Sequence, residues 1–162
     1  MPTNEHNELP LPMLAFKLES MDDSIELTID EVWGYPNETS YGGGYGAKGN
    51  LSIRAGEYMV VNATHYFTTG ELYSFLQQMK YCYEVLDGVA TLDNTERELD
   101  LKCTFNKKGH VLIEGHFQKD PSINNKLTFE LRSDQTQAAA TISSLKAVAE
   151  IFGDNKGVKK GK

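Results

Sequence analysis

The chain has 162 residues, of which 40% are hydrophobic and 24% charged, a composition typical of a single globular domain. Its formal net charge of -7 at pH 7 argues against nucleic acid or an anionic membrane surface as a partner, since both would repel it. The same charge permits a basic protein partner, although acidity also serves solubility alone.

The two ends of the chain are predicted to lie outside the folded body. Residues 1–20 are predicted to be a mobile lead-in, residues 21–153 a single α+β domain, and residues 154–162 a disordered basic tail. The N-terminal sequence has no basic segment and no apolar core of signal-peptide length, and no run approaches the length of a membrane span. We therefore expect a cytoplasmic protein.

The first third of the chain predicts strands separated by a long loop. Residues 25–30 and 51–54 alternate apolar and polar side chains with period two, and Tyr58 opens another strand after a turn at 55–57. Residues 36–46 hold glycines, a proline and polar turn formers, which indicates an exposed loop.

Residues 44–49, GYGAKG, match the dinucleotide-binding pattern GxGxxG. That motif holds a pyrophosphate only where it joins a strand to the N-terminus of a helix. Here a period-two strand follows instead, so we interpret the glycines as a wide turn between two strands. Tyr41 and Tyr45 on this loop are similar to the aromatic anchors of a paratope, and a plain mobile loop is the alternative.

The first helix is predicted to begin at a capping-box spacing from Thr68 to Glu71. Apolar residues then recur at steps of three and four, as on one face of a helix, and Gly88 stands where a left-handed C-terminal cap is expected.

Two alternating segments, residues 99–105 and 111–117, predict a hairpin around a turn at 107–109. In this register Cys103 faces Ile113 on the core side. The outward side then carries two pairs of opposite charge. These pairs are Lys102 with Glu114 and Asp100 with His116.

The last strand is predicted over residues 127–132, and either Ser133 or Asp134 can cap a second helix that ends at Gly153. The order of elements predicts an α+β fold, with an antiparallel sheet of about six to seven strands and two helices packed on one face. The other face of the sheet is polar by alternation, and we expect it to meet solvent or a partner.

No constellation in the sequence predicts catalysis or a bound cofactor. His110 and His116 share a strand face but lie roughly 20 Å apart along it, too far to hold one metal ion. Cys82 and Cys103 both lie on apolar faces, which favours a place in the core. We predict no metal, no cofactor and no enzymatic activity, and leave open a catalytic site scattered along the chain.

Acidic side chains gather in the first third of the sequence. Glu26 and Asp30 occupy outward positions of a predicted strand, and Glu31 follows directly. Such a cluster can steer a cationic partner, and the alternative is that charge protects an edge strand from pairing.

Three segments resemble the WapI-like family of bacterial immunity proteins. They are GELYSFL at residues 70–76, GHVLIEGHF at residues 109–117 and LTFELRSDQT at residues 127–136. The likeness extends from residue 25 to residue 153. This family is named for the protein that protects a bacterium from its own wall-associated toxin, whose C-terminal domain attacks RNA.

The resemblance implies a non-catalytic immunity protein that neutralises a cognate toxin, a basic nuclease, by covering its active surface. Glu26, Asp30, Glu31, Tyr41 and Tyr45 would then contact the toxin. We expect no nucleic acid and no membrane as partner, and the sequence leaves the oligomeric state open. The alternative is a small-ligand-binding or structural domain, with a pocket between sheet and helices.

Overall fold

The structure, a computed structural model, describes residues 9–159 and contains eight strands and two helices. In chain order they are β1 (Met13–Ser20), β2 (Asp23–Val32), β3 (Gly46–Ala55), β4 (Tyr58–Thr68), α1 (Thr69–Val85), β5 (Gly88–Leu92), β6 (Leu99–Phe105), β7 (His110–Phe117), β8 (Leu127–Asp134) and α2 (Gln135–Phe152). The predicted α+β class is confirmed. The strands are slightly more numerous than predicted, and they form two antiparallel sheets rather than one.

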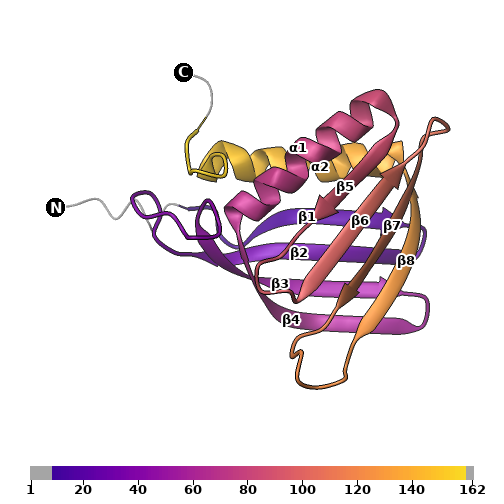
Figure 1. Ribbon diagram of the computed structural model, residues 1–162, viewed down its shortest axis with the longest axis horizontal. Helices are drawn as coiled ribbons and strands as arrows, with labels where there is room; N and C mark the ends of the chain where they lie inside the picture. Colours follow the sequence, from indigo (N-terminus) through magenta and orange to yellow (C-terminus); the bar gives the residue numbers. More distant parts are fainter. Residues whose placement is uncertain (1–8, 160–162) are drawn as a thin grey trace.

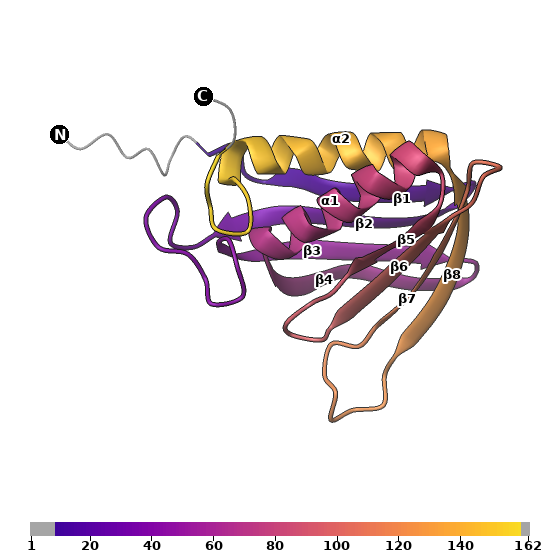
Figure 2. The ribbon, with the colours of Figure 1, turned by 45° about the horizontal axis from the view of Figure 1, so that its top comes forward.

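Each half of the chain builds the same unit, a four-stranded meander followed by a helix. One sheet has the order β1-β2-β3-β4 and the other the order β5-β6-β7-β8, and the two cross at a steep angle (Figure 1). The helices are exchanged between the halves, because α1 packs on β5 and α2 packs on β1. Figure 2 shows α2 lying along β1 at the top of the molecule. The apolar core fills the space between the sheets and under the helices.

Parts of the expected lead-in and tail contact the folded body. Residues 13–20, part of the expected lead-in, form β1, and Ala15 and Phe16 are fully buried. At the other end, the backbone N–H of Gly44 donates to the carbonyl of Asn155 at 2.6 Å, which ties the start of the expected tail to the β2–β3 loop. Residues 1–8 and 160–162, the outer parts of lead-in and tail, lie outside the described residues.

The predicted hairpin of residues 99–117 is confirmed in its register. Cys103 pairs with Ile113, and Gly109 in the turn has a φ of 81°, which favours glycine. Of the two outward pairs, His116 Nε2 lies 3.2 Å from Asp100 Oδ2. Lys102 and Glu114 are opposite each other in the ladder, but no ion pair joins them in the described part of the chain.

Both helix starts lie where the capping residues predict them. The hydroxyl of Thr68 accepts from the N–H of Glu71 at 3.1 Å, and the Asp134 carboxylate accepts from the N–H of Gln137 at 2.9 Å. The left-handed C-terminal cap of α1 is Leu86 (φ 51°), two residues before the predicted Gly88. The second helix ends at Gly153 as predicted.

A glycine on the third strand of each sheet lets the neighbouring backbone approach closely. A Cβ on Gly49 of β3 would lie 1.9 Å from the carbonyl oxygen of Thr28 and 2.9 Å from the Phe67 ring. Gly115 of β7 repeats this arrangement against a backbone carbonyl and the Phe129 ring. Gly49, the last glycine of GYGAKG, therefore serves close packing within a sheet.

Three of the four sheet edges are covered. The edge strands β1 and β8 meet at a corner, where the Ser133 hydroxyl donates to the carbonyl of Glu19 at 2.6 Å and the Ser20 hydroxyl donates to that of Arg132. Helix α1 lies against β5. The remaining edge, β4, has no paired strand on its outer side among the described residues.

Candidate functional site

One end of the molecule presents an exposed pair of aromatic rings, where the β2–β3 loop meets the end of β4. Trp33 stacks on Tyr66 with ring centroids 6.3 Å apart and an interplanar angle of 20°. Both rings remain accessible, with 47% of Trp33 and 41% of Tyr66 exposed. Exposed tryptophan and tyrosine are the residues that most often anchor protein interfaces.

Two open hollows border on Trp33, and acidic side chains line both. The hollow of ≈ 650 Å³ contains Asp30 and Glu31 in its wall, and the hollow of ≈ 350 Å³ contains Tyr41, Tyr66 and Glu96. We call the region that they form together the Trp33 surface. It comprises Asp30, Glu31, Trp33, Tyr41, Tyr66 and Glu96.

The charge of the Trp33 surface is negative. Lys119 is the basic side chain that contacts the aromatic pair, with its Nζ 4.9 Å from the centre of the Tyr66 ring. That charge is already engaged, because Lys119 Nζ lies 2.5 Å from Glu98 Oε2. Lys48 is the ladder neighbour of both Glu31 and Tyr66, and it brings a second positive charge to this surface. No ion pair of the described residues involves Asp30, Glu31 or Glu96.

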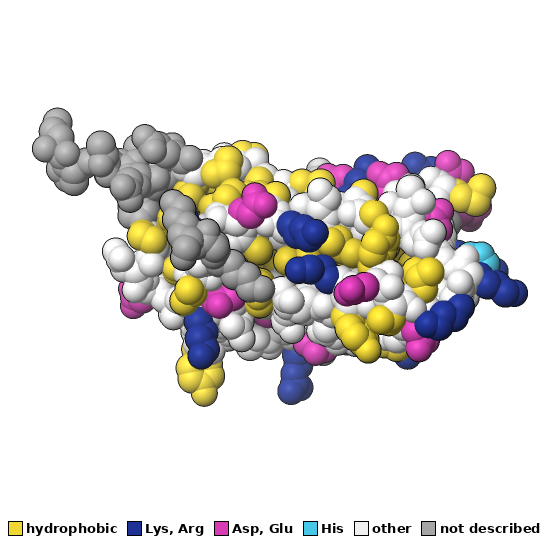
Figure 3. Space-filling model, turned by 90° about the horizontal axis from the view of Figure 1, so that it is seen from above, with side chains coloured by type: hydrophobic (Ala, Val, Ile, Leu, Met, Phe, Trp, Pro, Cys, Tyr) yellow, Lys and Arg dark blue, Asp and Glu magenta, His cyan; other side chains and the backbone are white. Residues whose placement is uncertain are grey.

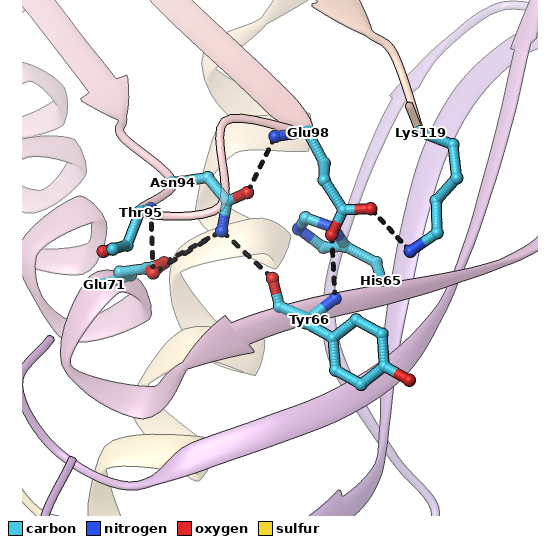
Figure 4. A network of polar contacts seen from close by, with 7 residues as sticks. All are labelled: His65, Tyr66, Glu71, Asn94, Thr95, Glu98 and Lys119. Atoms are coloured by element: carbon cyan, nitrogen blue, oxygen red, sulfur yellow. Dashed lines mark hydrogen bonds and ion pairs between the residues drawn. The ribbon is translucent and has the colours of Figure 1, made fainter. Parts of the chain in front are cut away.

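A buried polar network holds Tyr66 in place from within the molecule (Figure 4). The side-chain amide of Asn94, in the β5–β6 loop, donates to the backbone carbonyl of Tyr66 and to Glu71 Oε2, each at 3.1 Å. The backbone N–H of Tyr66 donates to Glu98 Oε1 at 3.4 Å. Both backbone groups of Tyr66 are thus fixed by side chains of another segment, which sets the position of its ring.

The network also joins the start of α1 to the β5–β6 loop. Glu71 accepts from the backbone N–H of Thr95 at 3.3 Å, and Asn94 Oδ1 accepts from the backbone N–H of Glu98 at 3.1 Å. Burial raises the pKa of Glu71 above its usual range, although the hydrogen bonds from Asn94 and Thr95 oppose this shift. Each buried oxygen of the network has a donor, which is the condition for a stable buried polar cluster.

His65 is the exception within this network. Its side chain is buried, and Nδ1 lies 3.5 Å from Glu98 Oε1 without a hydrogen-bond partner among the described residues. Burial lowers the pKa of His65 to about 4, and the attraction of Glu98 only partly opposes this. The ring is therefore neutral at pH 7, and it stacks on Phe67 with centroids 5.6 Å apart.

The lowered pKa of His65 predicts how the free energy of unfolding depends on pH. The unfolded chain binds a proton at His65 near pH 6.5, whereas the folded protein binds it only near pH 4. Stability is therefore lost as the pH falls through this window, and we expect the free energy of unfolding to drop by about 2 kcal/mol between pH 7.5 and pH 5 from this group. Urea denaturation at the two pH values measures the drop.

The control for this experiment is His65→Gln. Glu71 acts in the opposite sense, because its raised pKa favours the folded state at low pH and loses that contribution as the pH rises. Both proteins carry Glu71, so the difference between their pH dependences isolates His65. Equal pH dependences in the variant and the unchanged protein would contradict the assigned pKa shift.

The structure brings three of the five predicted contact residues together and separates the other two. Asp30, Glu31 and Tyr41 all lie on the Trp33 surface. Glu26 lies farther along β2 on the outer face of its sheet, and its Oε2 is 3.7 Å from Lys17 Nζ. This ion pair partly neutralises the Glu26 charge, so Glu26 contributes less to an acidic surface than expected.

The structure does not place Tyr45 on the surface, where the sequence-based interpretation had put it. Tyr45 is only 3% exposed, and its ring packs edge-on against Tyr35 and Phe152. Its hydroxyl donates to the carbonyl of Pro36 at 3.1 Å. A buried side chain cannot contact a partner directly, so Tyr45 instead holds the β2–β3 loop on the core.

Sequence reasoning missed the two aromatic residues at the centre of the surface. Trp33 directly follows the last residue of β2, and Tyr66 belongs to the outward phase of β4, between the buried His65 and Phe67. This alternation was a usable signal for Tyr66. The stacking of the two rings was not foreseeable, because it depends on the pairing of Glu31, Lys48 and Tyr66 across three strands.

The cysteines and the potential metal ligands of the described residues do not assemble a second site. Cys82 and Cys103 are buried as predicted, and burial raises the pKa of Cys103 to about 12. Within residues 9–159, no three histidine, cysteine or acidic side chains are placed to hold a metal ion. None of the helices described is both long and apolar enough to cross a membrane.

The helix face carries a shallow groove of ≈ 260 Å³ between α1 and α2. Lys80 and Lys146 line it opposite each other, with Leu76 and Ala149 between them and Glu150 beside them. Figure 3 shows basic, acidic and apolar side chains interspersed on this face. The groove is open to solvent and shares no lining residue with the two hollows at Trp33.

Comparison with known proteins yields one family. The family described as "Immunity protein WapI-like family" matches residues 17–153, from within β1 to the end of α2. This match begins slightly earlier than the resemblance recognised in the sequence. Comparisons with curated proteins and with solved structures give no match.

Proposed function

The chain belongs to the WapI-like immunity protein family, and we propose that it neutralises a cognate toxin by binding it stoichiometrically through the Trp33 surface. The observation that carries this proposal is the exposed Trp33–Tyr66 stack with carboxylates around it on an acidic chain. Aromatic anchors supply affinity, and the surrounding acidic side chains speed the encounter with a basic partner.

The partner we propose is a basic nuclease domain. A nuclease carries positive charge where it binds its nucleic-acid substrate, and an acidic protein competes for the same place. Binding alone then suffices for protection, so the protein acts without catalysis. The fold fits this role, since the network beneath Tyr66 fixes the aromatic pair before the partner arrives and lowers the entropy lost on binding.

Isothermal titration with the toxin domain that we expect to be encoded beside this protein tests the proposal. We expect one toxin domain bound per chain, with an affinity that falls as salt is raised, since salt screens the attraction. If the titration releases or absorbs no heat of binding and no complex forms at low salt, the proposal is contradicted.

The acidic side chains of the surface are tested by charge reversal. The double variant Asp30→Lys with Glu31→Lys is expected to slow association with the toxin by about tenfold or more at low salt. The matched control, Glu84→Lys with Glu150→Lys, makes the same change in net charge on the exposed sides of α1 and α2. Equal effects of the two double variants on the association rate would show that only total charge matters.

The alternative of a small-ligand-binding domain is favoured by one observation, the groove between α1 and α2. Its apolar side chains and its three lysines, Lys80, Lys146 and Lys159, suit a small anion with an apolar part. A thermal-shift screen with metabolites separates the two functions, because a ligand that binds the folded state raises the melting temperature. Stabilisation by a metabolite that Lys80→Ala abolishes would favour the ligand-binding function.

A further inference from the structure

Strand β4 is an open sheet edge with an unusual composition. It is the longest strand, with 11 residues, and it contains no aspartate, glutamate, lysine or arginine. Soluble proteins usually protect such an edge with charged residues or proline. Here the apolar side chains of Tyr58, Met59 and Val61 are instead exposed by 69%, 61% and 63%.

The direction of the backbone N–H and C=O groups of β4 shows that this edge can form hydrogen bonds with another backbone. At Tyr66 both the N–H and the C=O point away from β3, since Glu98 and Asn94 bind them from the β5–β6 loop. Backbone direction alternates along an antiparallel strand, so the N–H and C=O of Thr64 point the same way. No side chain of the described residues binds the outward groups of Thr64 as Asn94 and Glu98 bind those of Tyr66.

We infer that β4 receives an extended segment of the toxin as an added strand, hydrogen-bonded at Thr64 and apolar opposite Met59 and Val61. This inference rests on the proposed function and names the contact by which the partner is held. The added strand continues the row of bonds that Asn94 and Glu98 begin, and it ends beside the Trp33 surface. Strand addition supplies affinity through the backbone, while the neighbouring side chains select the partner.

The charge of the chain distinguishes a toxin segment from a second copy of this protein. Two copies each carry a net charge of -7, so pairing their β4 edges brings like charges together. A basic partner is attracted by the net charge of the chain as a whole, and β4 itself carries no aspartate, glutamate, lysine or arginine that would repel it. The β-bulge at Val61 and Asn62 also bends β4 locally, which hinders a long two-fold pairing of identical strands.

Thr64→Pro tests the added strand, because proline removes the outward N–H and leaves the bonds to β3 intact. We expect affinity for the co-encoded toxin domain to fall at least about tenfold, by the removal of one ladder bond and the clash of the ring with the added strand. The matched control is Asn124→Pro in the exposed β7–β8 loop, which places a proline away from β4. Circular dichroism and urea denaturation establish that both variants are folded.

Hydrogen exchange on the unmutated complex gives a second readout that needs no variant. We expect slowed exchange at the amides of residues 58–64 when the toxin domain is bound. Binding by a folded Thr64→Pro variant with unchanged affinity, or a complex without protection in β4, overturns the added strand and leaves the proposed function standing. If this protein forms a dimer that Thr64→Pro disrupts, the β4 edge binds a second copy of the chain. That result also overturns the added toxin strand. Absence of any complex overturns both.

Discussion

Trp33→Ala is expected to weaken binding of the cognate toxin by about 30- to 1,000-fold, the loss of about 2 to 4 kcal/mol that a central aromatic anchor supplies. Trp33 borders on both hollows of the surface and stacks on Tyr66, so its removal takes away the shared wall and half of the aromatic pair. Isothermal titration or surface plasmon resonance measures the loss. Most of it should appear as faster dissociation, since close contacts act mainly on the dissociation rate.

The matched control is Tyr81→Ala, which removes an aromatic ring that is 65% exposed on α1. Tyr81 follows the start of α1 by about three turns, or roughly 18 Å, so it lies well away from Trp33. Both variants remove a half-exposed side chain, and we expect each to change the free energy of unfolding by less than about 1 kcal/mol. Equal affinities of the two variants for the toxin would show that Trp33 is not an anchor.

Gly49→Ala is expected to lower the free energy of unfolding by at least about 3 kcal/mol, more than any surface substitution considered above. The added Cβ would lie 1.9 Å from the carbonyl oxygen of Thr28, a backbone atom in the adjacent strand β2. Relieving this clash requires β2 and β3 to separate, which breaks ladder bonds in the middle of the sheet. Urea denaturation of the purified variant measures the loss.

Gly56→Ala provides the comparison, since a Cβ at Gly56 meets no atom within 4 Å. Gly56→Ala is expected to lower the free energy of unfolding by about 1 kcal/mol, solely because residue 56 has a positive φ of 63°. A Gly49→Ala variant as stable as the Gly56→Ala variant would contradict the close approach of the two strands. The pair therefore separates a steric requirement for glycine from a conformational one.

Local signals predicted much of the fold, because they depend on neighbours in the sequence. The hairpin of β6 and β7 follows from two alternating segments and a glycine turn. Strand β1 escaped prediction because a register shift between Leu14 and Phe16 breaks its alternation, so that Ala15 and Phe16 are both buried. Alternation of apolar and polar residues along a strand shows that one face of the sheet is buried. It does not show whether a helix or another sheet buries that face, so the second sheet could not be predicted.

The candidate site was predictable only where charge and exposure follow from local sequence. Asp30, Glu31 and Tyr41 lie on polar or glycine-rich segments, and the structure brings them to one surface. Tyr45 lies on the same loop but is buried, because Tyr35 and Phe152 from distant parts of the chain enclose its ring. The network of Asn94, Glu98 and Lys119 joins the β5–β6 and β7–β8 loops to β4 and α1, and no spacing in the sequence marks it.

The most direct measurement is a titration of the nuclease activity that we propose for the toxin with increasing amounts of this protein. Stoichiometric neutralisation predicts that activity falls linearly and disappears at one molecule of protein per toxin, and that it returns when Trp33→Ala replaces the unmutated protein at the same concentration. Full nuclease activity in the presence of excess protein would contradict neutralisation by binding. Loss of activity at far less than one equivalent would contradict it equally, since it would mean that the protein inactivates the toxin catalytically.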